Sequence, residues 1–279
     1  MSVRCRKVVL PLLLLLIAAY GTLAAASKPV VWGTTTVIGE MLRMVGGDAI
    51  ESRVLIPPRS CPGHFDLSPS DAVRIADARL MLRHDFQAYL DRRLTAQNPE
   101  LEIEIVSTGG QVILPEAYLR GMTGVKELLR AHFPELAGQF EKNHKEAVEA
   151  VRNSADAALR QAQSAGLSGV RVLGAAKQKG LLAWLGLQVV DVFTSNHDEL
   201  SVLKLASLLQ TARDERIAFI AGNLQSGGEA VARTVASQAG LPAAILSNFP
   251  GSEEYNRTYH DLLLDNVSRL VRAANAELP

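Results

Sequence analysis

Cys61 and His64 are the residues of this chain whose types and spacing best suit chemistry. A thiolate sulfur and an imidazole nitrogen three residues apart can reach a common point, and soft transition-metal sites often contain these two donors. The same pair could serve as a nucleophile with its general base. The structural alternative is a turn that holds a small buried cysteine and a surface histidine. The pair alone leaves these three interpretations open.

The loop that carries this pair is rich in proline. Residues 57–71 contain four prolines and one glycine, and proline restricts the backbone, so a stiff loop is expected. An apolar, strand-like run at residues 54–56 precedes the loop, and Ser70 with Asp71 signals the start of a helix after it. The sequence therefore predicts that Cys61 and His64 are presented from a stiff loop at the end of a strand.

The N-terminus is typical of a secretory signal peptide. Residues 4–7 include three basic side chains, residues 8–19 form an almost unbroken apolar run, and residues 24–26 are alanines. The apolar run is short for a membrane span. Such a leader would direct the chain to the periplasm and would be cleaved near Ala26. Cys61 would then be the only cysteine of the mature chain, which excludes an internal disulfide.

Composition argues against a polyanionic partner. The formal net charge of the whole chain is zero, and it becomes −3 without the leader, which carries three basic residues and no acidic one. No basic patch with interleaved aromatic residues is present, so we expect no nucleic-acid binding. The roughly 250 residues after the leader suffice for one large domain or two modest lobes.

Strand-like apolar runs alternate with helical patterns in both halves of the chain. The expected strands are residues 30–32, 53–56, 79–82, 102–106, 170–173, 188–193, 216–220 and 243–246. The expected shorter helices are residues 38–45, 73–78, 177–185, 200–212, 226–238 and 255–274. This alternation predicts an α/β fold of two lobes with parallel sheets. In such sheets ligands bind outside the carboxyl ends of the strands, where the loop of Cys61 and His64 is expected.

One longer segment separates the two α/β patterns. Between Pro134 and Gly166 apolar residues recur at three- and four-residue steps, and no glycine or proline follows Gly138. About 30 helical residues would span roughly 45 Å, so we predict a strut that joins the lobes and limits them to small rocking. The predicted division is a signal peptide at 1–26, an N-terminal lobe at 27–132, a connecting helix at 133–166 and a C-terminal lobe at 167–279.

Four stretches of the sequence, taken in chain order, together resemble one known protein family. They are residues 34–48, the proline-rich loop at 57–71, the long helix preceded by residues 133–135, and residues 258–267 near the C-terminus. Together they resemble the zinc/manganese class of periplasmic solute-binding proteins, whose "D-P-H-x-Y/F-x-x-x-P-x-D" pattern the loop approaches. The resemblance implies a two-lobed binding protein without enzymatic activity or a catalytic cofactor. Its partners would be a metal ion as cargo and the membrane permease of an ABC importer, and we expect a monomer.

The family holds its metal with four ligands, usually three histidines and one acidic residue, or two of each. By resemblance, the first histidine falls on His64, the second on Gln111 and the third on Ala175, and the acidic ligand falls near Ser247. Three of the four positions therefore lack a strong ligand. The resemblance implies a metal site that has diverged from the family's usual donor set.

A divergent metal site can still be assembled from this sequence. Cys61 and His64 would supply two ligands, His84 is expected at the same rim, Gln111 could add a weak oxygen, and His197 lies in a strand-to-helix loop of the second lobe. A Cys/His set favours zinc, copper(I) or nickel over manganese, which prefers oxygen donors. We therefore predict a zinc-like cargo.

Two alternatives remain open at the level of sequence. The same cleft could bind a non-metal solute or a metal chelate, because most inherited ligands are replaced. A Cys61/His64 hydrolase is the more remote alternative, since neither a third orienting group nor an oxyanion motif is recognisable.

Overall fold

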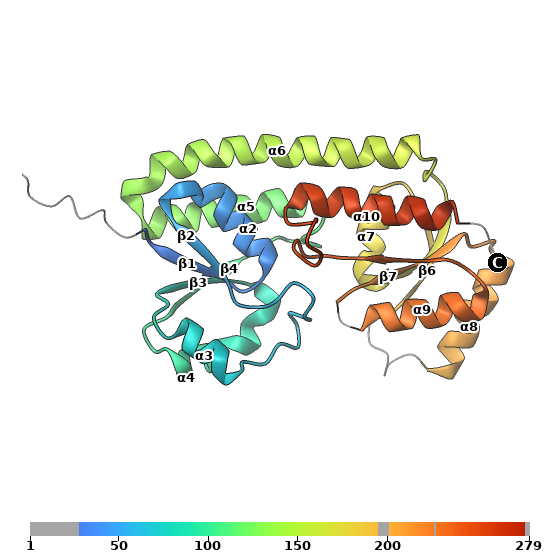
Figure 1. Cartoon of the computed structure of the whole chain (residues 1–279), viewed down its shortest axis with the longest axis horizontal. Helices are drawn as coiled ribbons and strands as arrows, with labels where there is room; N and C mark the ends of the chain where they lie inside the picture. The colour runs from blue at the N-terminus through green and yellow to red at the C-terminus, as the bar shows by residue number, and fades with distance from the viewer. Residues whose placement is uncertain (1–27, 195–200, 226, 277–279) are drawn as a thin grey trace, which may run out of the picture.

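The chain forms two α/β lobes that lie side by side under one long helix (Figure 1). The computed structural model describes residues 28–194, 201–225 and 227–276. Each lobe contains a four-stranded sheet whose strands are all parallel. The predicted fold class is confirmed. The predicted signal peptide lies outside the described residues, and no described helix is long and apolar enough to cross a membrane.

The N-terminal lobe has the strand order β2-β1-β3-β4. Its strands are β1 (Val30–Gly33), β2 (Glu51–Val54), β3 (Leu80–His84) and β4 (Glu102–Val106). Its helices are α2 (Thr36–Gly46), α3 (Pro69–Ile75), α4 (Asp91–Gln97) and α5 (Pro115–His132), with short 3-10 turns η1 (Gly47–Ala49) and η2 (Asp85–Leu90). Another 3-10 turn, η3 (Pro134–Leu136), leads directly into the long helix α6 (Ala137–Ser164).

The C-terminal lobe repeats this topology with the order β6-β5-β7-β8. Its strands are β5 (Arg171–Ala175), β6 (Gln188–Phe193), β7 (Phe219–Asn223) and β8 (Ala243–Leu246). Its helices are α7 (Lys179–Trp184), α8 (Val202–Asp214), α9 (Gly228–Ala239) and α10 (Tyr259–Ala274), with the 3-10 turn η4 (Ala176–Gln178). In both sheets the strand order reverses beside the first strand, which is where open parallel sheets place their ligands.

Two differences from the sequence-based expectation have physical causes. Helix α5 was not predicted, because Gly121 and Gly124 interrupt its pattern. Gly121 packs closely against α2, since a Cβ there would lie 2.8 Å from Cε of Met41. Strand β7 begins three residues later than predicted, because the chain still turns at Arg216, whose φ is 48°.

The start of helix α3 also differs by a small shift. The N-cap is Ser68, and not the Ser70 that the sequence suggested. The Ser68 hydroxyl accepts from the amide of Asp71, while the Asp71 carboxylate accepts from the amide of Ser68. This reciprocal capping box satisfies two backbone donors at the end of the proline-rich loop.

One hydrophobic core extends through both lobes beneath α6. Phe140, Val151 and Ala158 on the inner face of α6 are fully buried, and the same core contains side chains of α2 and α5 on one side and of α10 on the other. Each lobe has a further core on the opposite face of its sheet. Wide separation of the lobes would break the shared core. The expected small rocking and the lobe boundaries at residues 132 and 166 stay predictions.

A buried carboxyl group joins the two lobes next to this core. Glu40 on α2 accepts a hydrogen bond from the amide of Tyr259, the first residue of α10, at 3.0 Å, and another from Arg43 at 3.1 Å. The Tyr259 ring stacks on Tyr118 with a centroid distance of 4.0 Å. Burial raises the pKa of Glu40 above its ordinary value, since desolvation penalises the carboxylate. Oε2 of Glu40 is buried without a hydrogen-bond partner among the described residues.

Glu40→Gln should change how stability depends on pH. Because the folded pKa of Glu40 is raised above 4.5, the folded wild type binds more protons than the unfolded chain above that pH, and its stability falls as pH rises through the raised pKa. The glutamine variant should lack this part of the slope, which is at most about 1.4 kcal/mol per pH unit for one proton. Urea unfolding from pH 4.5 to 8 measures it, with the exposed Glu149→Gln as control. Equal slopes in wild type and Glu40→Gln would contradict this assignment.

Candidate functional site

A cavity of about 370 Å³ lies between the lobes, where the carboxyl ends of the two sheets meet. The N-terminal lobe lines it with residues at or after the ends of β2, β3 and β4, at positions 61–64, 84–86, 108 and 110–113. The C-terminal lobe lines it with residues at or after the ends of β5, β7 and β8, at positions 177, 223, 225 and 248–249. This is the location that parallel-sheet topology predicts for a ligand.

Cys61 and His64 both line this cavity and touch each other. Sγ of Cys61 lies 3.3 Å from Nδ1 of His64. Around one tetrahedral zinc ion, a sulfur ligand at about 2.3 Å and a nitrogen ligand at about 2.0 Å lie about 3.5 Å apart. The two donors are therefore already spaced almost as two ligands of one metal ion would be.

The loop of Cys61 and His64 is anchored to the N-terminal lobe by side chains of the turn η2. The carbonyl oxygen of Pro62 accepts hydrogen bonds from Oη of Tyr89 at 2.9 Å and from Nε2 of Gln87 at 3.3 Å. The Tyr89 hydroxyl also accepts from the amide of Phe65 at 3.0 Å, and the buried Gln87 accepts from Thr34 at 2.6 Å. The turn η2 thus fixes the loop on both sides of His64.

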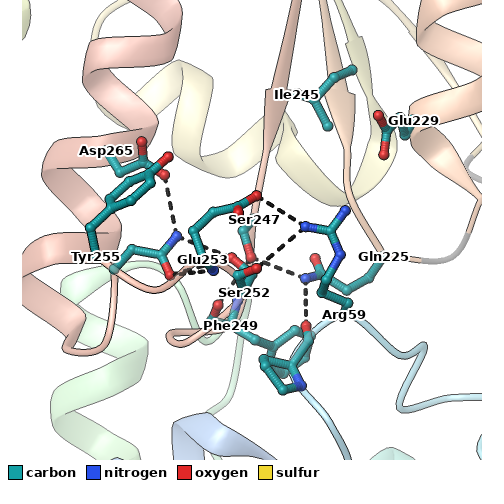
Figure 2. Close-up of polar contacts among 12 residues, drawn as sticks. Arg59, Gln225, Glu229, Ile245, Ser247, Phe249, Ser252, Glu253, Tyr255 and Asp265 are labelled. Atoms are coloured by element: carbon teal, nitrogen blue, oxygen red, sulfur yellow. Dashed lines mark hydrogen bonds and ion pairs between the residues drawn. The ribbon is translucent and has the colours of Figure 1, made fainter.

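The same loop is bonded to the C-terminal lobe (Figure 2). Nε2 of Gln225 donates to the carbonyl oxygen of Pro58 at 2.9 Å. The guanidinium of Arg59 donates to the carbonyl oxygen of Ser252 at 3.3 Å and to the carboxylate of Glu253 at 3.0 Å. The Arg59–Glu253 pair is partly exposed, so its contribution to stability is small. The contacts nevertheless connect the loop to both lobes.

His84 lies at the end of β3 and lines the same cavity, although only 2 % of its surface is exposed. Its Nε2 lies 2.9 Å from the hydroxyl of Thr35, and its ring stacks on Phe86 at a centroid distance of 5.1 Å. Burial lowers the pKa of His84 to about 4. The imidazole is therefore neutral at neutral pH, as a metal ligand must be, but the Thr35 hydroxyl occupies Nε2.

Both polar atoms of the Gln111 side-chain amide form hydrogen bonds to the C-terminal lobe. Its Nε2 donates to the carbonyl oxygen of Ala176 at 3.3 Å, and its Oε1 accepts from the amide of Gly180 near the start of α7 at 3.1 Å. Gly180 permits this approach, because a Cβ there would lie 2.4 Å from that oxygen. The oxygen that the sequence suggested as a weak metal ligand is thus bonded to the second lobe. His197 lies outside the described residues.

The other inherited ligand positions have structural roles. Ala175 ends β5 and is fully buried. The hydroxyl of Ser247 donates to the carbonyl oxygen of Phe249 at 3.0 Å and accepts from Gln225 at 3.0 Å. In the part of the chain that the structure describes, no three His, Cys, Asp or Glu side chains form a group able to hold a metal ion. A metal bound to Cys61 and His64 would keep open coordination positions.

Several residues of this cavity were missed by sequence reasoning. Asn223 and Asn248 lie at the carboxyl ends of β7 and β8 and line the cavity, as does Lys177 after β5. Their positions directly after strands were the available signal. The predicted strand at 216–220 ended too early, so Asn223 was not recognised as a strand-end residue.

The fold and the location of this cavity define a class of architecture: two α/β lobes that share one long helix and enclose a cavity between them. The family model described as "Zinc-uptake complex component A periplasmic" (ZnuA) matches residues 31–122, which lie in the N-terminal lobe. This match and the shared fold confirm the resemblance to the zinc/manganese class of periplasmic solute-binding proteins.

Solved structures show the same fold over most of the chain. The Mn-bound and Cd-bound forms of a periplasmic metal binding protein from Candidatus Liberibacter asiaticus are each 17% identical to this chain with a TM-score of 0.74. Each alignment covers 88% of this chain and 100% of that protein. A zinc-bound ZnuA deletion mutant is 14% identical to this chain with a TM-score of 0.73. That alignment covers 90% of this chain and 100% of the mutant's chain.

Tyr89→Phe should loosen the loop of Cys61 and His64. The substitution removes the hydroxyl that donates to Pro62 and accepts from the amide of Phe65. Each of the two hydrogen bonds contributes about 1 kcal/mol, so Cys61 should react with a thiol reagent, and the Phe65 amide should exchange with solvent, at least about fivefold faster. Tyr255→Phe is the matched control, since that hydroxyl contacts Arg269 instead. Unchanged rates in Tyr89→Phe would show that this hydroxyl does not restrain the loop.

Proposed function

We propose that this protein is an exported solute-binding protein that captures a soft, zinc-like transition metal in the cavity between its lobes. Cys61 and His64 are the proposed principal ligands. The observation that carries the proposal is their 3.3 Å sulfur–nitrogen separation at the edge where both sheets end. The family match over residues 31–122 supports it, as do the solved structures of similarly folded proteins in Mn-bound, Cd-bound and zinc-bound forms.

Donor chemistry supports zinc, copper(I) or nickel over manganese as the cargo, because a thiolate and an imidazole are softer donors than the oxygens manganese prefers. His84 is a proposed third donor, and it would have to give up its contact with Thr35. Gln111 would similarly have to release the amide of Gly180. His197 remains a proposed donor from the second lobe.

In the proposed cycle the protein performs coordination and no covalent chemistry. Capture requires the Cys61 thiol to lose its proton, so metal affinity should rise with pH. Delivery to the membrane permease of an ABC importer would follow when a small displacement of the lobes alters the loop. The contacts of Pro58 and Arg59 with the C-terminal lobe support such coupling, because lobe displacement would pull on residues next to Cys61.

The volume of the cavity favours a second candidate, which is capture of a larger solute. About 370 Å³ falls within the range of small-molecule sites and exceeds what a single metal ion needs. A metal chelate or a non-metal solute therefore remains the alternative cargo. The contact of Cys61 with His64 would also suit a hydrolase, but the family match supports binding instead of catalysis.

Metal analysis of the full-length protein purified without chelators tests the proposal. We expect about one zinc, copper or nickel ion per chain, and at least a tenfold loss of affinity in both Cys61→Ala and His64→Ala, equivalent to about 1.4 kcal/mol. His132→Ala is the matched control, since His132 contacts Glu102 and Glu104 instead of the cavity. Absence of metal from the wild type, with no change in melting temperature on adding zinc, copper(I), nickel or manganese, would refute the proposal.

A further inference from the structure

We propose that the C-terminal wall of the cavity is a subsite for the carboxylate group of a small organic chelator that enters together with the metal. This inference rests on the proposed function and specifies its cargo. Lys177 and Asn248 are the carboxylate-binding residues of the subsite, and Cys61 with His64 are the ligands that the opposite wall offers to the metal.

The two walls of the cavity differ in chemistry. The wall from the N-terminal lobe carries the metal donors Cys61 and His64. Among the described residues, the wall from the C-terminal lobe contributes no His, Cys, Asp or Glu to the lining, and its lining residues are Lys177, Asn223, Gln225, Asn248 and Phe249. While His84 and Gln111 keep their present contacts, Cys61 and His64 alone leave two positions of a tetrahedral zinc ion unfilled. A chelator can fill them from within the cavity.

A buried network of amides fixes the orientation of Asn248. Its Oδ1 accepts from Nε2 of Gln178 at 3.1 Å, and its Nδ2 donates to Oδ1 of Asn223 at 3.0 Å. Asn223 accepts a second bond from Gln178 at 2.8 Å and donates to the carbonyl oxygen of Gln225. Gln225 uses both of its side-chain N–H groups within the protein, on Pro58 and Ser247. Asn223 and Asn248 each use one, and because Asn223 is buried while Asn248 is half-buried, the second N–H of Asn248 is the more accessible to a ligand.

Lys177 adds a positive charge to the same wall. It is exposed, and it forms no ion pair with any residue in the described ranges. The acidic residue of the lining is Asp85, which belongs to the N-terminal lobe and accepts from the amide of Phe86 at 2.8 Å. An ammonium group and an oriented amide N–H on one wall are donors suited to the two oxygens of a carboxylate.

The remaining lining suits the carbon skeleton of such a ligand. Phe86, Val112 and Phe249 supply apolar surface, and 54 % of Phe86 is exposed. The cavity volume of about 370 Å³ corresponds to roughly a dozen water molecules at about 30 Å³ each, far more than the two waters that would complete a tetrahedral metal. A small carboxylate chelator fills this space with contacts that both walls provide.

Calorimetry on the metal-stripped full chain tests this inference. The probes are zinc alone, zinc with citrate, zinc with L-histidine, and zinc with ethylenediamine, a chelator without a carboxylate. We expect citrate or L-histidine to bind with zinc as a 1:1:1 complex, at least tenfold more tightly than zinc with ethylenediamine. Lys177→Met and Asn248→Leu should each lose most of this difference, while the neighbouring exposed Lys179→Met, which does not line the cavity, should retain it.

Two outcomes overturn the inference separately from the proposed function. If zinc alone binds stoichiometrically and every chelator only competes for it, the subsite is refuted while metal capture stands. If the preference for carboxylate chelators survives in Lys177→Met and in Asn248→Leu, the assigned residues are refuted. If neither zinc nor any zinc chelate binds, and Cys61→Ala is indistinguishable from wild type, the proposed function fails together with the inference.

Discussion

The candidate site depends on a short loop whose backbone carbonyl groups accept hydrogen bonds from side chains of both lobes. Prolines donate no backbone hydrogen bond, so the carbonyl oxygens of Pro58 and Pro62 are the groups that neighbouring side chains can hold. Gln225 of the C-terminal lobe holds the first, while Gln87 and Tyr89 of the N-terminal lobe hold the second. Cys61 and His64 lie on this segment, and their positions therefore depend on both lobes.

This loop is mounted on lobes that cannot separate widely without cost. The long helix α6 and the core beneath it join the lobes on one side, and the contact between Glu40 and Tyr259 adds a buried polar link. The contacts of Gln111 and Arg59 close the opposite side around the cavity. Small displacements would therefore act on the cavity itself, which is the coupling that capture and delivery of a cargo require.

The fold could be predicted from the sequence because its signals are local. Alternating strand and helix patterns identified both sheets, but helix α5 was not predicted, because Gly121 and Gly124 interrupt its helical pattern. Cys61 and His64 were recognisable from their spacing within one loop. The interlobe role of Gln111, and the orientation of Asn248 by its neighbouring amides, depend on residues far apart in the chain and could not be derived from local patterns.

X-ray absorption spectroscopy of the zinc-loaded protein tests the central claim most directly, because it distinguishes sulfur from nitrogen and oxygen neighbours of the metal. The account predicts one sulfur at about 2.3 Å, with nitrogen and oxygen ligands at about 2.0–2.2 Å, and loss of the sulfur signal in Cys61→Ala. A zinc environment made only of nitrogen and oxygen in the wild type would contradict the assignment of Cys61 and His64 as the metal-binding pair.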